Sequence, residues 1–139
     1  MAYPFSYSHQ FNYREVNGKS FPILQLRISN PQQPELGIDI DTYIDSGAEY
    51  SILNGWIATS LGIALLSGEP RWFGTTIGNR IEGRRHRVRL FHPDLGSFDL
   101  EVALSTQDIR RDLLGRDFFN LVQIGFRENR QQYYLTSSP

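Results

Sequence analysis

The sequence contains no cysteine, so a disulfide framework and a thiolate nucleophile are both excluded. A cysteine-free chain suits a reducing compartment, and we expect a cytoplasmic location. Histidine is scarce as well: only His9, His86 and His92 are present, and no pair of them has the spacing of a zinc-binding motif. We interpret all three as surface residues, and we expect neither a metal nor another cofactor.

Strong net charge and long apolar runs are also absent. The formal net charge is -1, which gives no electrostatic reason to expect nucleic acid or a membrane as a partner. No apolar run approaches the length of a membrane span, and the first residues lack the basic start and apolar middle of a signal peptide. The length of 139 residues favours a single domain over residues 1–139, with its core at about residues 21–126. We assign no role to residues 1–20 and 127–139.

Alternation of apolar and polar residues with a period of two predicts strands along most of the chain. Short helical turns are expected only near residues 56–61 and 118–121. Many short strands with few helices indicate an all-β fold, either a barrel or a sandwich. The predicted strands cover residues 21–29, 38–44, 71–91 (a hairpin that turns near 77–80), 96–105, 122–126 and 131–136.

Residues 43–53, which read YIDSGAEYSIL, place Asp45, Ser46 and Gly47 between two apolar stretches. These residue types are typical of tight turns, so a plain turn is one interpretation. The other is a carboxylate that a rigid loop presents for chemistry, since a strand-like run leads directly into it. A second unit, LLGRD at residues 113–117, follows the predicted hairpin.

The order of these features is more specific than either motif alone. An apolar strand entering Asp-Ser-Gly-Ala-Glu, then a glycine-containing hairpin, then Leu-Leu-Gly-Arg-Asp before a short helix resembles the retropepsins, the aspartic proteases of retroviral type. The resemblance covers about residues 21–126. It implies an all-β fold, namely a closed β-barrel with a flap hairpin and one short helix in its C-terminal half, of which two copies form the active site.

The resemblance also implies roles for individual residues. Asp45 matches the catalytic aspartate, and the hydroxyl of Ser46 matches the group that bonds across to the loop of a second subunit. Glu49 and Arg116 match an acid and a base that form an ion pair; otherwise each is simply solvated. The residues that would support the active site are Ser46, Gly47, Leu114, Gly115 and Arg116. The residues that would bind substrate are Gly47, Ala48 and Glu49 beside the aspartate, and Ile77, Gly78 and Asn79 at the tip of the flap.

Peptide hydrolysis of this type needs two carboxylates. When they lie about 3 Å apart they share one proton, so one acts as a base towards water while the other protonates the carbonyl oxygen. The chain has a single Asp-Ser-Gly and is too short for two lobes, so the second carboxylate must be Asp45 of another copy. The sequence therefore predicts a symmetric homodimer that cleaves peptide or protein substrates. Ala48 has no hydroxyl to donate to the carboxylate, so we expect activity in mildly rather than strongly acid conditions.

The main rival to a peptidase is a dimer of the same fold that binds peptides or serves as a scaffold without turnover. Such a protein would not need an intact Asp-Ser-Gly.

We expect Asp117 to cap the short helix rather than to take part in catalysis. Arg85, Arg87 and Arg89 share one face of a predicted strand, which favours a solvated surface over a docking site for an acidic partner. We place four aromatic residues in the core or in the wall of a subsite, namely Trp56, Trp72, Phe118 and Phe119.

Overall fold

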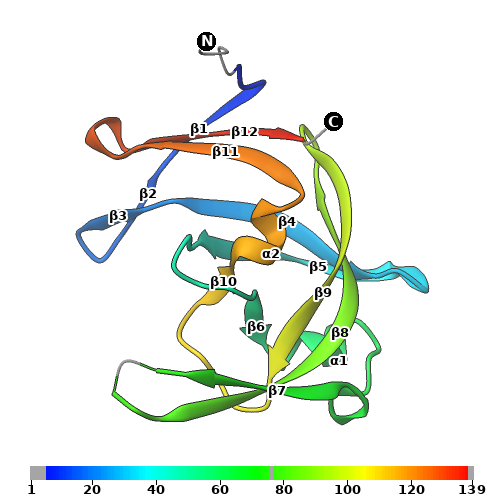
Figure 1. Ribbon diagram of the computed structural model, residues 1–139. Coiled ribbons are helices and arrows are strands. Elements are labelled where there is room, and N and C mark those ends of the chain that lie inside the picture. Colours follow the sequence, from blue (N-terminus) through cyan, green and yellow to red (C-terminus); the bar gives the residue numbers. More distant parts are fainter. Residues whose placement is uncertain (1–5, 76, 138–139) are drawn as a thin grey trace.

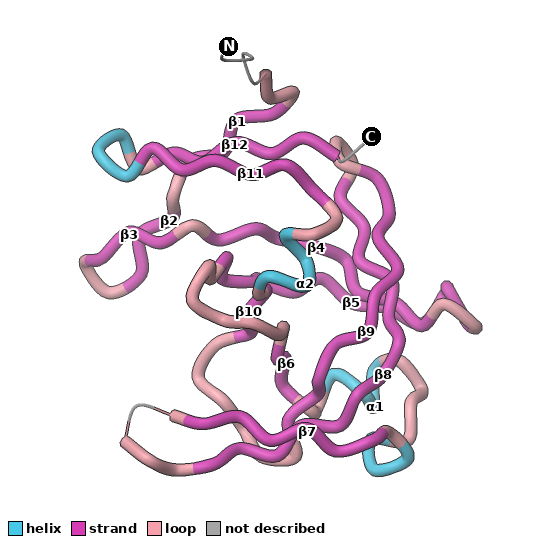
Figure 2. The backbone as a smooth tube through the Cα atoms, viewed as in Figure 1, coloured by secondary structure: helices cyan, strands magenta, loops and turns pink. Residues whose placement is uncertain are grey.

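The chain folds almost entirely into strands joined by short turns. The computed structural model describes residues 6–75 and 77–137, and only short helices interrupt the strands (Figure 1 and Figure 2). No helix in this part of the chain combines the length and apolar character needed to cross a membrane. The strands are β1 (His9–Asn12), β2 (Arg14–Val16), β3 (Lys19–Phe21), β4 (Ile23–Asn30), β5 (Gln33–Ile44), β6 (Ile52–Asn54), β7 (Glu69–Gly74), β8 (Arg80–His92), β9 (Gly96–Ser105), β10 (Asp112–Leu114), β11 (Val122–Arg127) and β12 (Gln132–Ser137). The helices are α1 (Ile57–Ser60) and α2 (Arg116–Phe119), and the short 3-10 helices are η1 (Leu65–Ser67) and η2 (Glu128–Arg130).

The largest sheet closes on itself. Its strand order is β4-β5-β10-β6-β9-β8-β7, and β4 also pairs with β8, where Ile28 lies opposite Leu90. The strands from β4 to β8 in that order form a barrel, and β7 extends the sheet beyond it by pairing with β8. The all-β fold is confirmed, and the β7–β8 hairpin is the predicted one, with Gly74 opposite Arg80.

Alternation along the strands decides which side chains fill the barrel. In β4, Leu24, Leu26 and Ile28 are buried, while Gln25 and Arg27 between them are exposed. Because successive side chains of a strand point to opposite faces, β4 presents one apolar row to the core. Each fully buried leucine or isoleucine stabilises the fold by about 1.5–3 kcal/mol relative to an exposed one.

The first described strand and the last two described strands cover the barrel. β1, β12 and β11 form a separate antiparallel sheet in that order, across the top of Figure 1. Tyr133 of β12 is fully buried, and its hydroxyl donates to the carbonyl oxygen of Ile23 over 2.8 Å. Phe11 of β1 stacks on the Tyr133 ring with 5.2 Å between the ring centroids. The core therefore extends past the predicted range of residues 21–126, and the ends without an assigned role supply part of it.

All three histidines and one tryptophan lie elsewhere than the sequence predicted. His9, the first residue of β1, is partly buried. His86 is partly buried because η1 packs over it, and its Nε2 lies 2.7 Å from the carbonyl oxygen of Leu65. His92 is partly buried against the ring of Phe11, and this burial lowers the pKa of His92. Trp56 precedes α1 and is 53% exposed rather than part of the core. In each case the local pattern does not reveal whether a distant element covers the residue.

The arginine-rich face of β8 forms ion pairs with β9. Arg89 pairs with Asp99 at 2.8 Å, and Arg85 pairs with Glu101 at 3.6 Å. Both pairs are partly exposed, so each contributes less than about 1 kcal/mol. This arrangement agrees with the solvated surface that the alternation favoured.

Candidate active site

Asp45 follows directly after the end of a buried strand. β5 ends at Ile44, which is 6% exposed, and residues 42–44 pair in parallel with β10. The N–H of Asp45 donates to the carbonyl oxygen of Leu114 over 2.9 Å, which continues this pairing into the loop. Ile44 and Leu114 are both core residues, so their burial fixes the point at which the loop begins.

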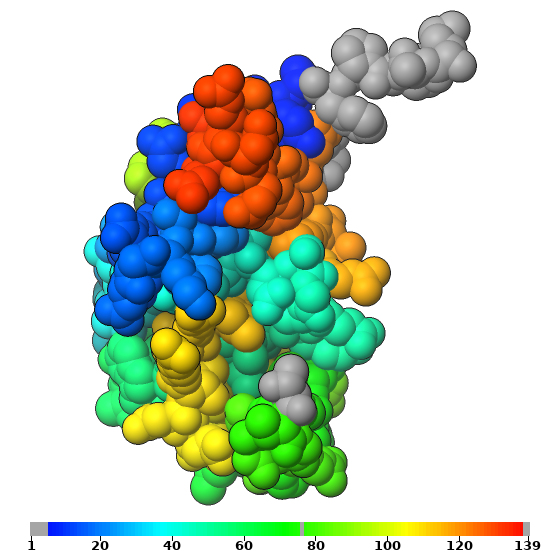
Figure 3. Space-filling view, turned by 90° about the vertical axis from the view of Figure 1, so that its left-hand side faces the viewer, coloured from blue at the N-terminus to red at the C-terminus, as the bar shows by residue number. Residues whose placement is uncertain are grey.

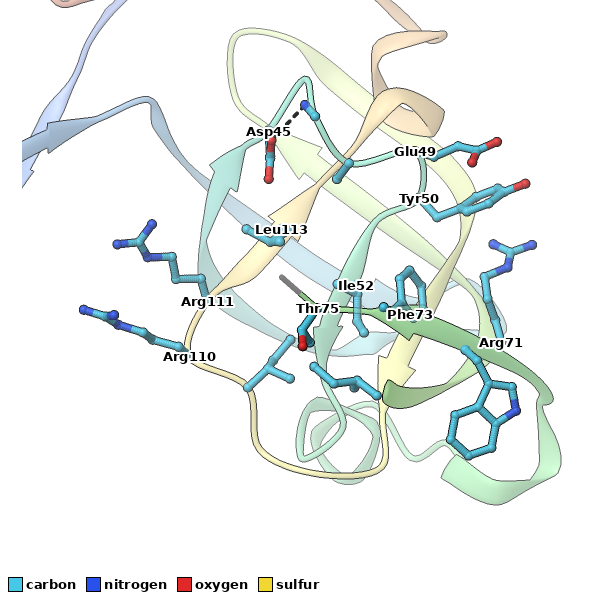
Figure 4. Close-up of a pocket in the computed structure, with 16 residues that line it drawn as sticks. Asp45, Glu49, Tyr50, Ile52, Arg71, Phe73, Thr75, Arg110, Arg111 and Leu113 are labelled. Atoms are coloured by element: carbon cyan, nitrogen blue, oxygen red, sulfur yellow. Dashed lines mark hydrogen bonds between the residues drawn. The ribbon is translucent and has the colours of Figure 1, made fainter. Parts of the chain in front are cut away.

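The chain turns back on itself immediately after Asp45. The N–H of Gly47 donates to Oδ1 of Asp45 over 2.9 Å, the contact drawn in Figure 4. The N–H of Ala48 donates to the backbone carbonyl oxygen of Asp45 over 3.2 Å. An aspartate bonded to the backbone two residues later is typical of a tight turn. The same bond fixes the direction of the Asp45 carboxylate. The tight turn therefore also holds the carboxylate in one orientation.

Gly115 allows a second segment to approach this loop closely. A Cβ atom at residue 115 would lie 2.6 Å from the carbonyl oxygen of Ala48 and 2.9 Å from the carbonyl carbon of Tyr50. Both distances are well inside van der Waals contact, so only glycine fits without displacing the loop. The next residue, Arg116, donates its N–H to the carbonyl oxygen of Ala48 over 2.8 Å. The LLGRD segment therefore braces the loop that carries Asp45.

Ser51 and Asp117 link the two motifs by hydrogen bonds. The N–H and the hydroxyl of Ser51 both donate to the Asp117 carboxylate, over 2.9 and 2.6 Å. The same hydroxyl accepts from the N–H of Gly115 over 2.9 Å. Ser51 is fully buried, so these bonds satisfy groups that water does not reach. Ser51 could not be selected from the sequence, where its only signal is a lone hydroxyl residue at the start of an apolar run.

The prediction that Asp117 caps α2 is wrong. Gly115 occupies the N-cap position without a side-chain bond, and Asp117 lies inside the first turn of the helix. Water does not reach the N–H and the hydroxyl of Ser51, so both donors need an acceptor from the protein. The Asp117 carboxylate accepts from both. Asp117 is therefore a bridge between the motifs.

Asp45 lines a cavity of about 850 Å³, which we call the Asp45 cavity (Figure 4). This volume is in the range of cavities that hold ligands in proteins, about 300–1,000 Å³. Gly47, Ala48 and Glu49, three of the residues predicted to bind substrate, line it as well. The other walls come from the β7 side of the hairpin and from the segment that leads into β10.

The described residues at the tip of the hairpin, 77–79, do not line this cavity. Ile77, Gly78 and Asn79 are exposed, and Ile77 is 81% exposed. The hairpin lines the cavity through residues 71–75 and through Ile81 instead.

Three arginines of the cavity wall were not selected from the sequence. The guanidinium of Arg71 lies over the ring of Tyr50, 3.7 Å from its centroid. Arg110 and Arg111 lie on the opposite side of the cavity from Arg71 and Tyr50 (Figure 4). The available signal for Arg110 and Arg111 was their position, with only Asp112 between them and the LLGRD unit.

The expected ion pair between Glu49 and Arg116 is absent. Both side chains are exposed, and in the described part of the chain no ion pair joins them. Each side chain is solvated, as the alternative interpretation had it, because backbone atoms and Ser51 make the contact between the two segments.

Residues 6–75 and 77–137 contain no group of three or more side chains that could hold a metal ion.

Comparison with known proteins gives structural neighbours only. No family model and no curated protein matches the sequence. The crystal structure of a retropepsin-like aspartic protease from Rickettsia conorii is similar over 97% of this chain and 98% of that one, with a TM-score of 0.66 and 16% identity. The structure of EIAV protease complexed with the inhibitor HBY-793 is similar over 77% of this chain and 92% of that one, with a TM-score of 0.54 and 18% identity. At such low identity the likeness establishes the fold, and this chain has the retropepsin fold.

Proposed function

We propose that the chain is one subunit of a homodimeric aspartic endopeptidase in which Asp45 is the catalytic residue. One observation carries the proposal: the Asp45 carboxylate is held at the end of a buried strand and lines the Asp45 cavity. A plain surface turn would need neither the bracing by Gly115 nor the buried bonds of Ser51. The retropepsin fold of the chain is consistent with this function.

The second carboxylate of the reaction would come from another copy of the chain. Besides Asp45, the described wall of the cavity contains a single carboxylate, that of Glu49, which is exposed. Two copies of Asp45 related by a two-fold axis would supply the pair and would form an isologous interface. Ser46 is exposed in the single subunit, so its hydroxyl is available to bond to the loop of the partner.

The proposed reaction needs no cofactor. One Asp45 carboxylate, ionised, takes a proton from a water molecule while the other, protonated, donates its proton to the scissile carbonyl oxygen. The water oxygen attacks the carbonyl carbon to give a diol. The C–N bond then breaks as the amide nitrogen takes the proton that the first carboxylate removed from water, and a hydroxyl of the diol returns a proton to the second carboxylate. The carbonyl oxygen of Gly47 would accept from the substrate backbone, Ala48 and Glu49 would line the cleft, and the flap tip would close over it.

The test is cleavage of a diverse peptide mixture in mildly acid buffer. Wild-type protein, Asp45→Asn and Asp39→Asn are compared at concentrations where sedimentation shows the dimer. Asp39 is exposed and lies outside the Asp45 cavity, so Asp39→Asn matches the charge change without touching the site. Removal of the general acid and base should slow cleavage at least about a hundredfold, whereas the control should retain it.

A dimeric wild type that cuts no peptide would contradict the proposal and favour the rival, a peptide-binding dimer. Cleavage that survives Asp45→Asn would contradict it as well. A pepstatin-like transition-state mimic gives an independent reading, because it should bind a competent pair of carboxylates far more tightly than a plain peptide does.

A further inference from the structure

A second cavity adjoins the Asp45 cavity. Its volume is about 340 Å³, and its lining comes from the β2–β3 hairpin and from the segment that leads into β10. On the face shown in Figure 3, residues 14–21 (blue) lie next to residues 105–111 (yellow). Arg110 and Arg111 line both cavities, so the two share a wall. We call the smaller one the basic cavity.

Positive charge dominates the lining of the basic cavity. Lys19, Arg110 and Arg111 line it together with Val16, Asn17 and Phe21, and none of these described lining residues is acidic. The whole chain has a formal net charge of -1, so this concentration of cations is local. None of the ion pairs between described residues includes Lys19, Arg110 or Arg111. Like charges that lie close together without counter-charges favour the binding of an anion.

Aromatic rings hold Arg111 in place. Its guanidinium carbon lies 4.4 Å from the ring centroid of Phe21 and 4.7 Å from that of Tyr43. The two rings also pack edge to face at 5.5 Å, so they form a fixed platform. A guanidinium on an aromatic face keeps its N–H donors in its own plane, where a planar carboxylate can accept two of them.

We propose that the basic cavity binds an acidic side chain, aspartate or glutamate, of a peptide whose backbone lies in the Asp45 cavity. The shared wall allows one peptide to reach both cavities, with Arg110 and Arg111 contacting its carboxylate. The consequence for cleavage rests on the proposed function: the chain would select acidic peptides. The binding itself does not require turnover and is measured without it.

The test uses pairs of labelled peptides that differ only by glutamate or glutamine, with the acidic residue moved through each position in turn. Binding to the protein that carries Asp45→Asn is measured by fluorescence anisotropy. At one position glutamate should bind about tenfold more tightly than glutamine, which corresponds to about 1.4 kcal/mol. The ratio should fall towards one in the double variant Arg110→Gln and Arg111→Gln. It should also shrink as salt is added, because salt screens exposed charges.

Two further variants keep the result interpretable. Arg127→Gln with Arg130→Gln removes the same charge from exposed positions outside both cavities, and this control should retain the ratio. Arg110→Gln alone removes an exposed side chain, so it serves if the loss of the stacked Arg111 prevents folding. It should lower the ratio about threefold, which is roughly half of the expected free energy.

The outcomes separate this inference from the proposed function. A ratio near one at every position would overturn the acidic site, and so would an equal loss in the control variant. Peptide cleavage by the wild type without discrimination would leave the peptidase standing and refute the site. Tighter binding of glutamate than of glutamine, without cleavage by the wild type, would leave the acidic site standing and refute the peptidase. Binding of no peptide at all would overturn both.

Discussion

Replacement of Gly115 by alanine tests the close contact on which the position of Asp45 depends. The new Cβ would meet the carbonyl oxygen of Ala48 at 2.6 Å, and both groups are backbone or attached directly to it. Neither can rotate away, so the loop must move. Overpacking of this kind costs about 1–3 kcal/mol. The bonds from Asp45 N–H to Leu114 and from Arg116 N–H to Ala48 span the same contact, and losing each costs about 1 kcal/mol more. We expect a total loss of about 3–5 kcal/mol in the free energy of unfolding.

The assay is urea unfolding at equal protein concentration, because association of subunits would itself change the apparent stability. With a slope of about 2 kcal/mol per molar urea, the midpoint of Gly115→Ala should fall by about 2 M. Gly74→Ala is the matched control: no atom of the described residues lies within 4 Å of the added Cβ, and the backbone there is not in the left-handed region. Its stability should stay within about 0.5 kcal/mol of the wild type. An equally small change in Gly115→Ala would refute the close approach of the two segments.

Three further changes probe other parts of the fold. Ser51→Ala leaves the N–H of Gly115 without its acceptor in a buried site, so urea unfolding should show a loss of about 2 kcal/mol. Tyr133→Phe removes the hydroxyl that donates to Ile23 and should cost about 1 kcal/mol, with peptide cleavage unchanged because Tyr133 lies outside both cavities. Burial lowers the pKa of His92, so the unfolded chain binds a proton that the folded chain resists. Stability from this residue is therefore full above about pH 6.5 and is lost as the pH falls through the folded pKa; urea unfolding of His92→Gln should lack that decline.

The sequence predicted the features that depend on neighbouring residues. Alternation identified β4 and the apolar row of Leu24, Leu26 and Ile28, because the period of two is a local property of a strand. The turn-forming residues likewise predicted the β7–β8 hairpin. The order of the two motifs indicated the retropepsin fold, which the structural neighbours support.

The errors concern partners that lie far away in the chain. The local context of Asp117, before an apolar turn, suggested a helix cap, but its carboxylate binds Ser51, 66 positions earlier. The arginines of the basic cavity look like ordinary surface charges until the β2–β3 hairpin is placed beside them. The hairpin tip could be located from its turn residues, but which of its residues line the cavity depends on the twist of the whole sheet.

The pairing of β5 with β10 has a consequence for the order of events during synthesis. Asp45 leaves the ribosome well before residues 112–117, which hold its loop. Contacts between such distant segments form late, because the chain must first close a long loop. A nascent chain that has exposed Asp-Ser-Gly therefore still lacks the backbone acceptor of Leu114 and the brace of Gly115. The site forms only when the barrel does, so the proposed activity is withheld from partly made chains.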